Sequence, residues 1–149
     1  MSNGPLPTTL TFLSALPTHP PGTKIRFLGC VTNYTLHKGI LELQHAYPPP
    51  PSHKSILALV DVNLLLETLR REDTQVGAWV NVVGYLEGIV KEGKRGKMRE
   101  TERDVEAQQG DAAPVVYVRV QAIMLWAAGG VKIGEYEKAL GERFKDLRG

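Results

Sequence analysis

Residues 24–34 read KIRFLGCVTNY, and this stretch has the pattern of a bent β-strand. Ile25 and Phe27 alternate with Lys24 and Arg26, so we expect a strand that buries one of its two faces. Gly29 stands in the middle, and a mid-strand glycine is typical of a bulge or of the sharp bend that a barrel corner needs. The stretch therefore favours a small, strongly curved sheet.

Four more apolar runs, separated by proline and glycine turns, predict four further strands. They are ILELQHAY (40–47), SILALVDV (55–62), VGAWVNVVGYLEG (76–88) and PVVYVRVQAIMLW (114–126). The side chains expected to face inward on the last two strands are Ala78, Val80, Val82, Val116, Val118, Val120 and Ala122. Between the third and fourth strands, NLLLETLRRE (63–72) predicts a short helix of about two turns.

Five strands with a helix between the third and the fourth describe an OB-fold, a five-stranded Greek-key barrel. The fold class that we expect is all-β with flanking helices, and another small α+β sheet is the alternative. The 149 residues suit a single domain. Its expected parts are an N-terminal segment (1–22), a barrel (23–126) with a long polar loop at about 88–114, and a C-terminal helix (131–147).

The C-terminal stretch VKIGEYEKALGERFKDL (131–147) is amphipathic at helical spacing. One stripe holds Ile133, Tyr136, Leu140, Phe144 and Leu147. This stripe packs either against the chain's own barrel or against another protein. Two features favour a partner: a hinge at Gly129 and Gly130, and a spacing typical of helix–helix packing.

Composition and motifs argue against catalysis, and we expect no enzyme, no metal and no cofactor. Cys30 is the single cysteine and lies in an apolar strand, where a thiol is a small core side chain. The four histidines, His19, His37, His45 and His53, lack zinc-ligand spacing. There is no signal-peptide pattern and no apolar run of transmembrane length, so we expect a soluble intracellular protein.

Binding of nucleic acid has modest support from a local basic run. The candidate residues are Tyr34, Lys38, Lys91, Lys94, Arg95, Lys97 and Arg99, in the loops with which OB-folds hold oligonucleotides. Acidic residues soon follow this run, the formal net charge is only +2, and the second strand has no paired aromatic residues for stacking bases. We therefore expect weak binding of single-stranded DNA by the chain alone.

The ordered set of segments resembles the small, Ten-type subunit of the CST telomere-capping complex. The resemblance rests on LTFLSALP (10–17), GTKIRFLGCVTNY (22–34), LELQHAY (41–47), VGAWVNVVGYLEG (76–88) and RVQAIMLWAAGGVKIGEYEKALGERF (119–144). It covers most of the chain except the proline loop after Tyr47 and the insert at 88–114, and it puts any function of those two loops in doubt.

The resemblance implies a heterodimer with a larger OB-fold subunit, within a heterotrimer that binds telomeric single-stranded DNA in the nucleus. Such a complex protects chromosome ends and regulates telomere replication. The stripe residues Ile133, Tyr136, Leu140, Phe144 and Leu147 would then face the partner, with Arg26 beside them. The alternatives are the smallest subunit of a complex like replication protein A and a self-sufficient single-strand DNA-binding protein.

Overall fold

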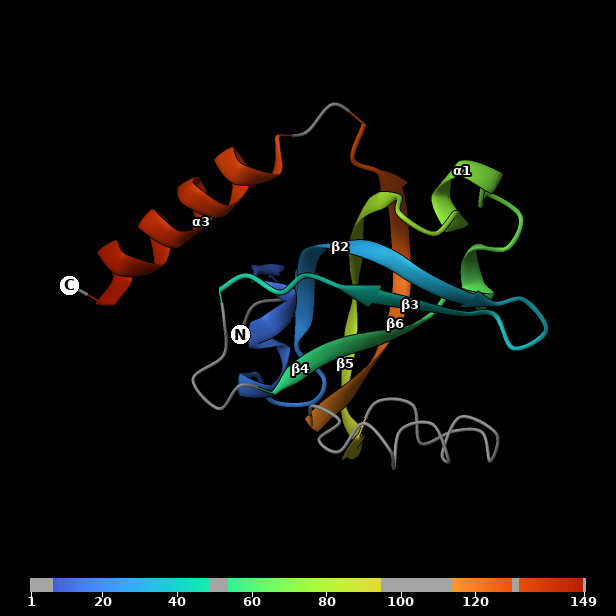
Figure 1. The fold of residues 1–149 in the computed structure, drawn as a ribbon, viewed down its shortest axis with the longest axis horizontal. Coiled ribbons are helices and arrows are strands. Elements are labelled where there is room, and N and C mark those ends of the chain that lie inside the picture. The colour runs from blue at the N-terminus through green and yellow to red at the C-terminus, as the bar shows by residue number, and fades with distance from the viewer. Residues whose placement is uncertain (1–6, 49–53, 95–113, 130–131, 149) are drawn as a thin grey trace, which may run out of the picture.

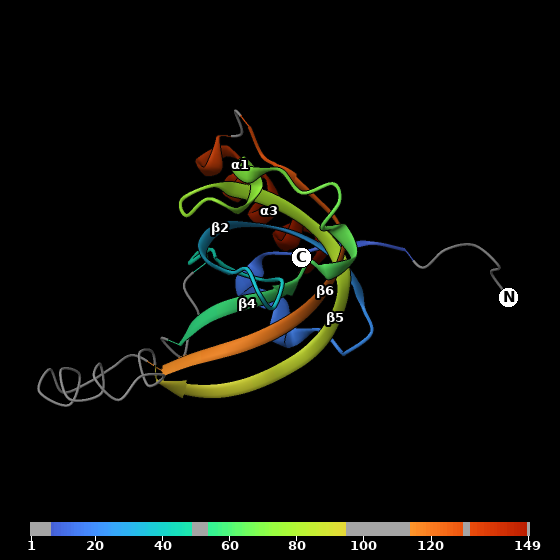
Figure 2. The same ribbon diagram turned by 90° about the vertical axis from the view of Figure 1, so that its right-hand side faces the viewer.

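The computed structural model describes residues 7–48, 54–94, 114–129 and 132–148, with the backbone alone at 91–94 and 144–148. Five strands close a ring in the order β2–β3–β4–β6–β5 and back to β2 (Figures 1 and 2). Their bounds are β2 Lys24–Thr35, β3 Ile40–Gln44, β4 Ser55–Asp61, β5 Trp79–Lys94 and β6 Pro114–Ala127. The expected five-stranded OB-type architecture is confirmed. A two-residue strand, β1 (Thr9–Leu10), adds to it in parallel with β2.

Strand β2 bends as its sequence predicts, because it pairs with two different strands along its length. Lys24 to Cys30 pair with β5, and Cys30 to Thr35 pair with β3. A register shift follows between Val31 and Asn33. At Gly29 an added Cβ would lie 3.0 Å from both Leu13 Cδ1 and Leu43 Cβ, so the missing side chain makes room for neighbours inside the barrel.

The core fills the barrel with the side chains that the period-2 pattern assigned to it. Ile25 and Phe27 are fully buried. The inward-facing prediction is confirmed for Val80, Val82, Val116, Val118, Val120 and Ala122, which are all buried, while Ala78 is partly buried against them.

Short helices pack against this core from the two ends of the barrel. The 3-10 helix η1 (Leu13–Thr18) buries Leu13 and Leu16 completely, so part of the N-terminal segment belongs to the core. Towards the right of Figure 1, the 3-10 helix η2 (Asn63–Leu65) is followed by α1 (Arg71–Thr74), and Leu65 and Leu69 pack against the core.

The continuous helix expected at 63–72 is therefore wrong. Arg70 has extended backbone angles, and its N–H donates to the Asp73 side chain at 3.0 Å, so a new one-turn helix starts there. The apolar spacing that suggested a longer helix is instead satisfied by a turn that points Leu65 and Leu69 inward and leaves Leu64 69% exposed.

Helix α3 (Ile133–Arg148) follows β6 and confirms the expected C-terminal helix. Gly129 precedes it with a positive φ of 62°, which reverses the chain direction away from the sheet. Figure 1 shows α3 at the upper left, outside the ring of strands, and its Tyr136 contacts Phe12 in the segment just before η1. None of the helices that the structure describes is both long and apolar enough to span a membrane.

Candidate interaction site

Helix α3 lies against this chain's own N-terminal segment. Leu140 is only 4% exposed, and the Tyr136 ring meets the ring of buried Phe12 edge-on, with 6.0 Å between the ring centroids. Tyr136 thus packs on Phe12 and Leu140 is buried within this chain, while the assignment of the stripe to a partner stays a prediction. Ile133 is partly buried, and Phe144 and Leu147 lie in α3 where only the backbone is described.

Burial also affects the acidity of the Tyr136 hydroxyl. Loss of solvent raises the pKa of Tyr136 to about 12, and the charge of Arg26 and the Leu28 backbone oppose this shift only in part. The hydroxyl makes no hydrogen bond within normal limits of geometry. Tyr136 therefore serves this interface as an apolar ring and stays protonated at physiological pH.

A buried histidine joins α3 to the end of β3. His45 Nε2 lies 2.7 Å from Glu137 Oε2, and the His45 side chain is 3% exposed. The imidazole sits among rings from other elements: the centroid distances are 5.2 Å to Trp79, 6.0 Å to Phe12 and 6.2 Å to Tyr136. Because an ionised carboxylate can only accept, Nε2 donates this bond.

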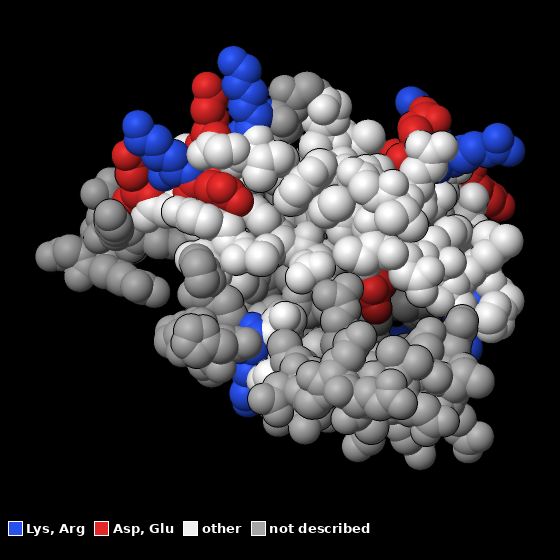
Figure 3. Space-filling model, viewed as in Figure 1, with Lys and Arg blue, Asp and Glu red and all other residues white. Residues whose placement is uncertain are grey.

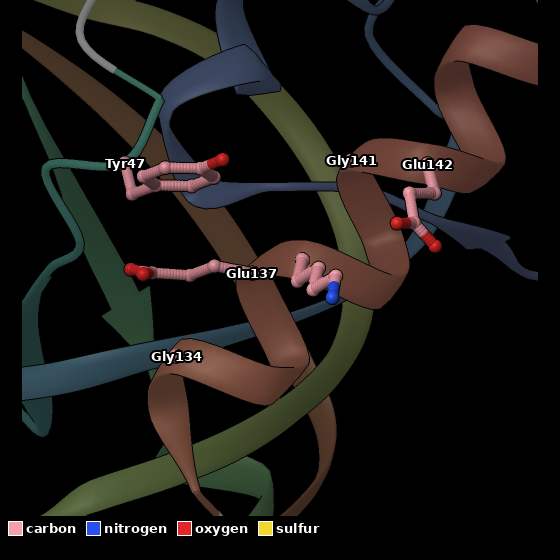
Figure 4. A pocket seen from close by; sticks show the side chains of 6 residues that line it. Tyr47, Gly134, Glu137, Gly141 and Glu142 are labelled. Atoms are coloured by element: carbon pink, nitrogen blue, oxygen red, sulfur yellow. The ribbon is translucent and has the colours of Figure 1, made fainter.

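Between this contact and solvent lies a hollow of about 330 Å³, shown in Figure 4. Tyr47 forms one wall, and the α3 residues Gly134, Glu137, Gly141 and Glu142 contribute to the other. A Cβ at Gly141 would lie 3.8 Å from the Tyr47 hydroxyl, which is an ordinary van der Waals distance, so the Tyr47 ring lies beside the helix without requiring a glycine there.

A larger groove, of about 490 Å³, runs beside α3 over the outer face of β1, β2, β5 and β6. Its lining residues are Thr8, Leu10, Lys24, Arg26, Val83, Ile123, Met124, Trp126 and Arg143. Met124 is 55% exposed, and the Arg26 guanidinium carbon lies 5.2 Å from the centre of the Trp126 ring, within the range of a cation–π contact.

This groove, which we name the Arg26 groove, combines an apolar floor with basic side chains. Lys24, Arg26 and Arg143 line it, and its described lining includes no acidic residue. Such a surface suits an apolar protein segment that carries carboxylates. The sequence analysis found Arg26 through the family resemblance. It missed Met124 and Trp126, although outward-facing large apolar residues on a strand are a usable signal.

The predicted nucleic-acid residues do not form one described cluster. Tyr34 packs partly against the core, while Lys38 is exposed at the β2–β3 turn. Lys91 and Lys94 were assigned to a loop, but they belong to β5, which pairs with β6 as far as Lys94. Arg95, Lys97 and Arg99 lie outside the described residues.

An OB-fold holds an oligonucleotide across its second and third barrel strands, which are β3 and β4 here, and with the loops that join β2 to β3 and β5 to β6. A surface that spans this region is formed by β2 to β6. It contains a hollow of about 160 Å³ lined by Asn33, Thr35, Ile40, Glu42, Leu59, Val90 and Tyr117. This described lining has a carboxylate but no lysine or arginine, which is unfavourable for phosphate groups. Figure 3 shows charged side chains gathered over α3 and around α1, with a largely uncharged face between them.

Next to this hollow, Arg119 is already bound to acidic neighbours. Its Nη2 lies 3.1 Å from Asp61 Oδ2, and its Nε lies 3.1 Å from Glu87 Oε1. Burial opposes ionisation of Asp61, but hydrogen bonds from Asn63 and Arg119 outweigh it and hold the pKa of this carboxyl below its usual range. Arg119 is thus bound to two carboxylates of this chain at the barrel surface.

The described residues offer little for metal binding or nucleophilic chemistry. No group of three histidine, cysteine, aspartate or glutamate side chains among them is placed to hold a metal ion. Burial raises the pKa of the Cys30 thiol, which disfavours the reactive thiolate.

Comparison with known proteins identifies the family. A profile of the Ten1 family, described as a telomere-capping subunit of the CST complex, matches residues 1–141. The chain belongs to the Ten1 family. The resemblance noted in the sequence is confirmed, and the functional setting of this family is telomere capping. No curated protein sequence gives a significant match to the chain.

Solved structures agree with the fold of a Ten1 family member. A chain of the S. pombe Stn1–Ten1 complex is 23% identical with a TM-score of 0.63, over 95% of this chain and 96% of its own length. A structure of S. pombe Ten1 is also 23% identical, with a TM-score of 0.61, over 93% of this chain and 99% of its own. A chain of U. maydis replication protein A bound to single-stranded DNA is 14% identical, with a TM-score of 0.50 and 97% of each chain covered.

Proposed function

We propose that this chain is a non-enzymatic subunit that pairs with a larger OB-fold protein of the Stn1 type in the nucleus. The pair would act within a complex that binds telomeric single-stranded DNA, protects chromosome ends and regulates telomere replication. The observation that carries the proposal is the family match over residues 1–141. The solved S. pombe complex, in which Ten1 is paired with Stn1, supports the choice of partner.

The Arg26 groove is the surface that we assign to this partner. It is apolar at its floor and basic at Lys24, Arg26 and Arg143, and α3 contributes to it through Arg143. The five stripe residues stay in the proposal: Tyr136 and Leu140 hold the helix beside the groove, and we assign Ile133, Phe144 and Leu147 to the contact with the partner.

The role of the chain in DNA binding is proposed to be indirect. The hollow on its OB face has a carboxylate and no described basic lining, so the isolated chain should bind single-stranded DNA weakly and with strong salt dependence. Neutralising Lys94, Arg95 and Lys97 together should lower the salt slope of the complex modestly. Tight binding by the chain alone that is insensitive to salt would favour a self-sufficient DNA-binding protein instead.

The second candidate is the smallest subunit of a complex like replication protein A. Its support is the likeness to a chain of the U. maydis protein, at 14% identity. Affinity purification from cells of the source organism, followed by mass spectrometry, distinguishes the two candidates. Recovery of a Stn1 homologue supports the proposal, whereas recovery of large replication protein A subunits in its place refutes it.

Direct titration with the purified Stn1 homologue of the same organism tests the assigned surface. Replacing Arg26 with Glu and Met124 with Asp together places acidic groups on the groove, so the dissociation constant should rise about a hundredfold or more. We avoid acidic substitutions at Tyr136 and Leu140 because they would disturb the docking of α3 as well.

Matched controls separate this surface from a general effect of charge. Lys132→Glu reverses a charge on an exposed side chain outside the groove, and Leu36→Asp adds an acid at an apolar residue that is 76% exposed on the β2–β3 turn. Both controls should bind like the wild type. If the controls and the groove variant weaken binding equally while circular dichroism shows all of them folded, the groove assignment is wrong.

A further inference from the structure

We propose that the buried His45–Glu137 pair is a positioning contact that sets the place of α3 on the barrel and, through it, the place of Arg143 on the Arg26 groove. The two residues are 92 positions apart in sequence, with His45 directly after β3 and Glu137 in the second turn of α3. The positioning of the helix follows from the structure alone. Its consequence for pairing rests on the proposed function.

Helix α3 has few described polar contacts that could fix its position on the barrel. The His45–Glu137 pair joins α3 to the barrel at hydrogen-bond distance, whereas Lys132–Glu135 lies at the beginning of the helix and is local. The remaining described contacts, at Tyr136 and Leu140, are apolar or aromatic and have little directional preference. Apolar packing holds the helix down, but it tolerates sliding and rotation.

The geometry of the His45–Glu137 contact is sensitive to the position of α3. A helix residue turns by about 100° and rises about 1.5 Å relative to its neighbour, so a shift of one residue along α3 would remove the Glu137 carboxylate from His45. The Nε2–Oε2 distance of 2.7 Å leaves little freedom, because hydrogen bonds weaken steeply when stretched or bent. The pair therefore fixes both the rotation and the axial position of the helix.

The His45 imidazole is held in place by its surroundings and cannot follow a displaced helix. The rings of Phe12, Trp79 and Tyr47, which lie outside α3, surround it at centroid distances of 5.2 to 6.4 Å, and the side chain is 3% exposed. Its Nδ1 is buried without a hydrogen-bond partner. The hydrogen bond to Glu137 compensates His45 for its lost contact with water. If α3 left, the buried Nε2 would lose this bond, and the cost of that loss favours the docked position of the helix.

Helix α3 connects the His45–Glu137 contact to the Arg26 groove, because Glu137 and Arg143 lie on the same rigid helix. Arg143 follows Glu137 by about 9 Å along the axis, at 1.5 Å per residue, and Arg143 lines the groove that Arg26 and Trp126 also line. Fixing the second turn of α3 thus fixes the side chain that the helix contributes to the groove. A partner then meets a preformed surface and loses less entropy on binding.

Amide hydrogen exchange of the full-length chain tests the contact itself. Glu137→Ala removes the acceptor and should accelerate exchange in α3 by about tenfold to a hundredfold. Glu137→Gln keeps an oxygen acceptor at the same place and should restore most of the protection, whereas Glu137→Met keeps a similar bulk without an acceptor and should exchange like Glu137→Ala. Wild-type protection in Glu137→Met would show that the role of the side chain is purely steric. Glu135→Ala, on a side chain 76% exposed in the same helix, is the matched control and should leave exchange unchanged.

Titration of the same variants with the Stn1 homologue tests the consequence. Glu137→Ala should weaken pairing about tenfold or more, Glu137→Gln should stay close to the wild type, and Glu135→Ala should match it. Unchanged exchange in Glu137→Ala overturns the positioning contact. Faster exchange with unchanged affinity overturns its role in pairing. If the wild-type chain does not pair at all, the proposed function fails, while the exchange data still decide whether His45 and Glu137 position the helix.

Discussion

Replacing Gly84 with Ala should destabilise the barrel more than any other single methyl group added at the described glycines that have no positive φ. An ideal Cβ at Gly84 would lie 2.3 Å from the Gln121 carbonyl oxygen, 2.9 Å from its carbon and 3.0 Å from Ala122 Cα. All three atoms belong to the backbone of β6, so no side chain can rotate away. The ladder between β5 and β6 shifts register between Val83 and Gly84.

The size of the effect follows from how far the strands must separate. A Cβ and a carbonyl oxygen need about 3.3 Å or more, since carbon–oxygen contacts between strands fall at about 3.3–3.6 Å. The two strands must therefore part by about 1 Å where their hydrogen bonds hold the ring closed. Overpacking of this kind costs about 1–3 kcal/mol, and a weakened ladder hydrogen bond adds about 1 kcal/mol. We expect a loss of about 3 kcal/mol in the free energy of unfolding.

Urea unfolding followed by the fluorescence of Trp79 and Trp126 measures this loss as a lower midpoint at unchanged slope. Gly134→Ala is the control, because a Cβ there meets no atom within 4 Å and the position is helical, so the variant should be neutral or slightly stabilising. A Gly84→Ala variant within about 0.5 kcal/mol of the wild type would show that β5 and β6 can separate freely there, and would refute the reasoning.

Three further predictions concern single side chains. Because burial raises the pKa of Tyr136 to about 12, the folded chain keeps a proton that an unfolded chain releases at about pH 10. The free energy of unfolding should therefore fall between about pH 10 and pH 12. Urea unfolding at a series of pH values measures this fall, and Tyr136→Phe should remove the part of it that comes from this hydroxyl. Leu140→Ala should weaken the docking of α3 by about 2–5 kcal/mol or release the helix altogether, seen as faster amide exchange in α3 than in the wild type. Arg119→Met should raise the pKa of Asp61 by removing a hydrogen-bond donor and a positive charge, which carboxyl NMR titration would detect; an unchanged value would mean that Asn63 alone holds it down.

The barrel was predictable because its signals are local and repeated. Alternation in KIRFLGCVTNY and in PVVYVRVQAIMLW assigns each side chain to one face, and Phe27 and Val118 are fully buried as that alternation requires. The order of strands and the mid-strand Gly29 then restrict the possible topologies. Neither signal depends on which residues lie across the barrel.

The helix at 63–72 was not predictable in the same way, since a side chain three residues away decided it. Spacing of apolar residues cannot show that Asp73 accepts the N–H of Arg70 and restarts the chain as a one-turn helix. Likewise, the charged run assigned to a loop contains residues that continue β5, because pairing with β6 extends the strand beyond its apolar part.

Of the candidate interaction site, the sequence predicts the helix stripe but not the surfaces around it. The stripe on α3 is evident from spacing, but spacing does not identify the surface that covers it. Phe12 and His45 lie far from α3 in sequence, and only the fold brings them to Tyr136 and Glu137. The Arg26 groove escaped detection because it is formed by four strands and a helix, none of which carries a motif of its own.

The pairing of β2 has a consequence for the order in which a newly made chain reaches its final shape. The C-terminal half of β2 pairs with β3, which follows it closely in the sequence. Its N-terminal half can pair only after β5 has been synthesised, since Lys24 pairs with Tyr85. The ring cannot close until the ribosome has released β6, and His45 has no carboxylate to bind until the last helix emerges, 92 residues after it was made. Distant pairings of this kind fold slowly, within about milliseconds to seconds. We therefore expect a ribosome-bound chain that stops before β6 to leave the barrel unclosed and its apolar side chains exposed. Such a chain should be prone to aggregation and proteolysis, and should depend on chaperones until translation ends.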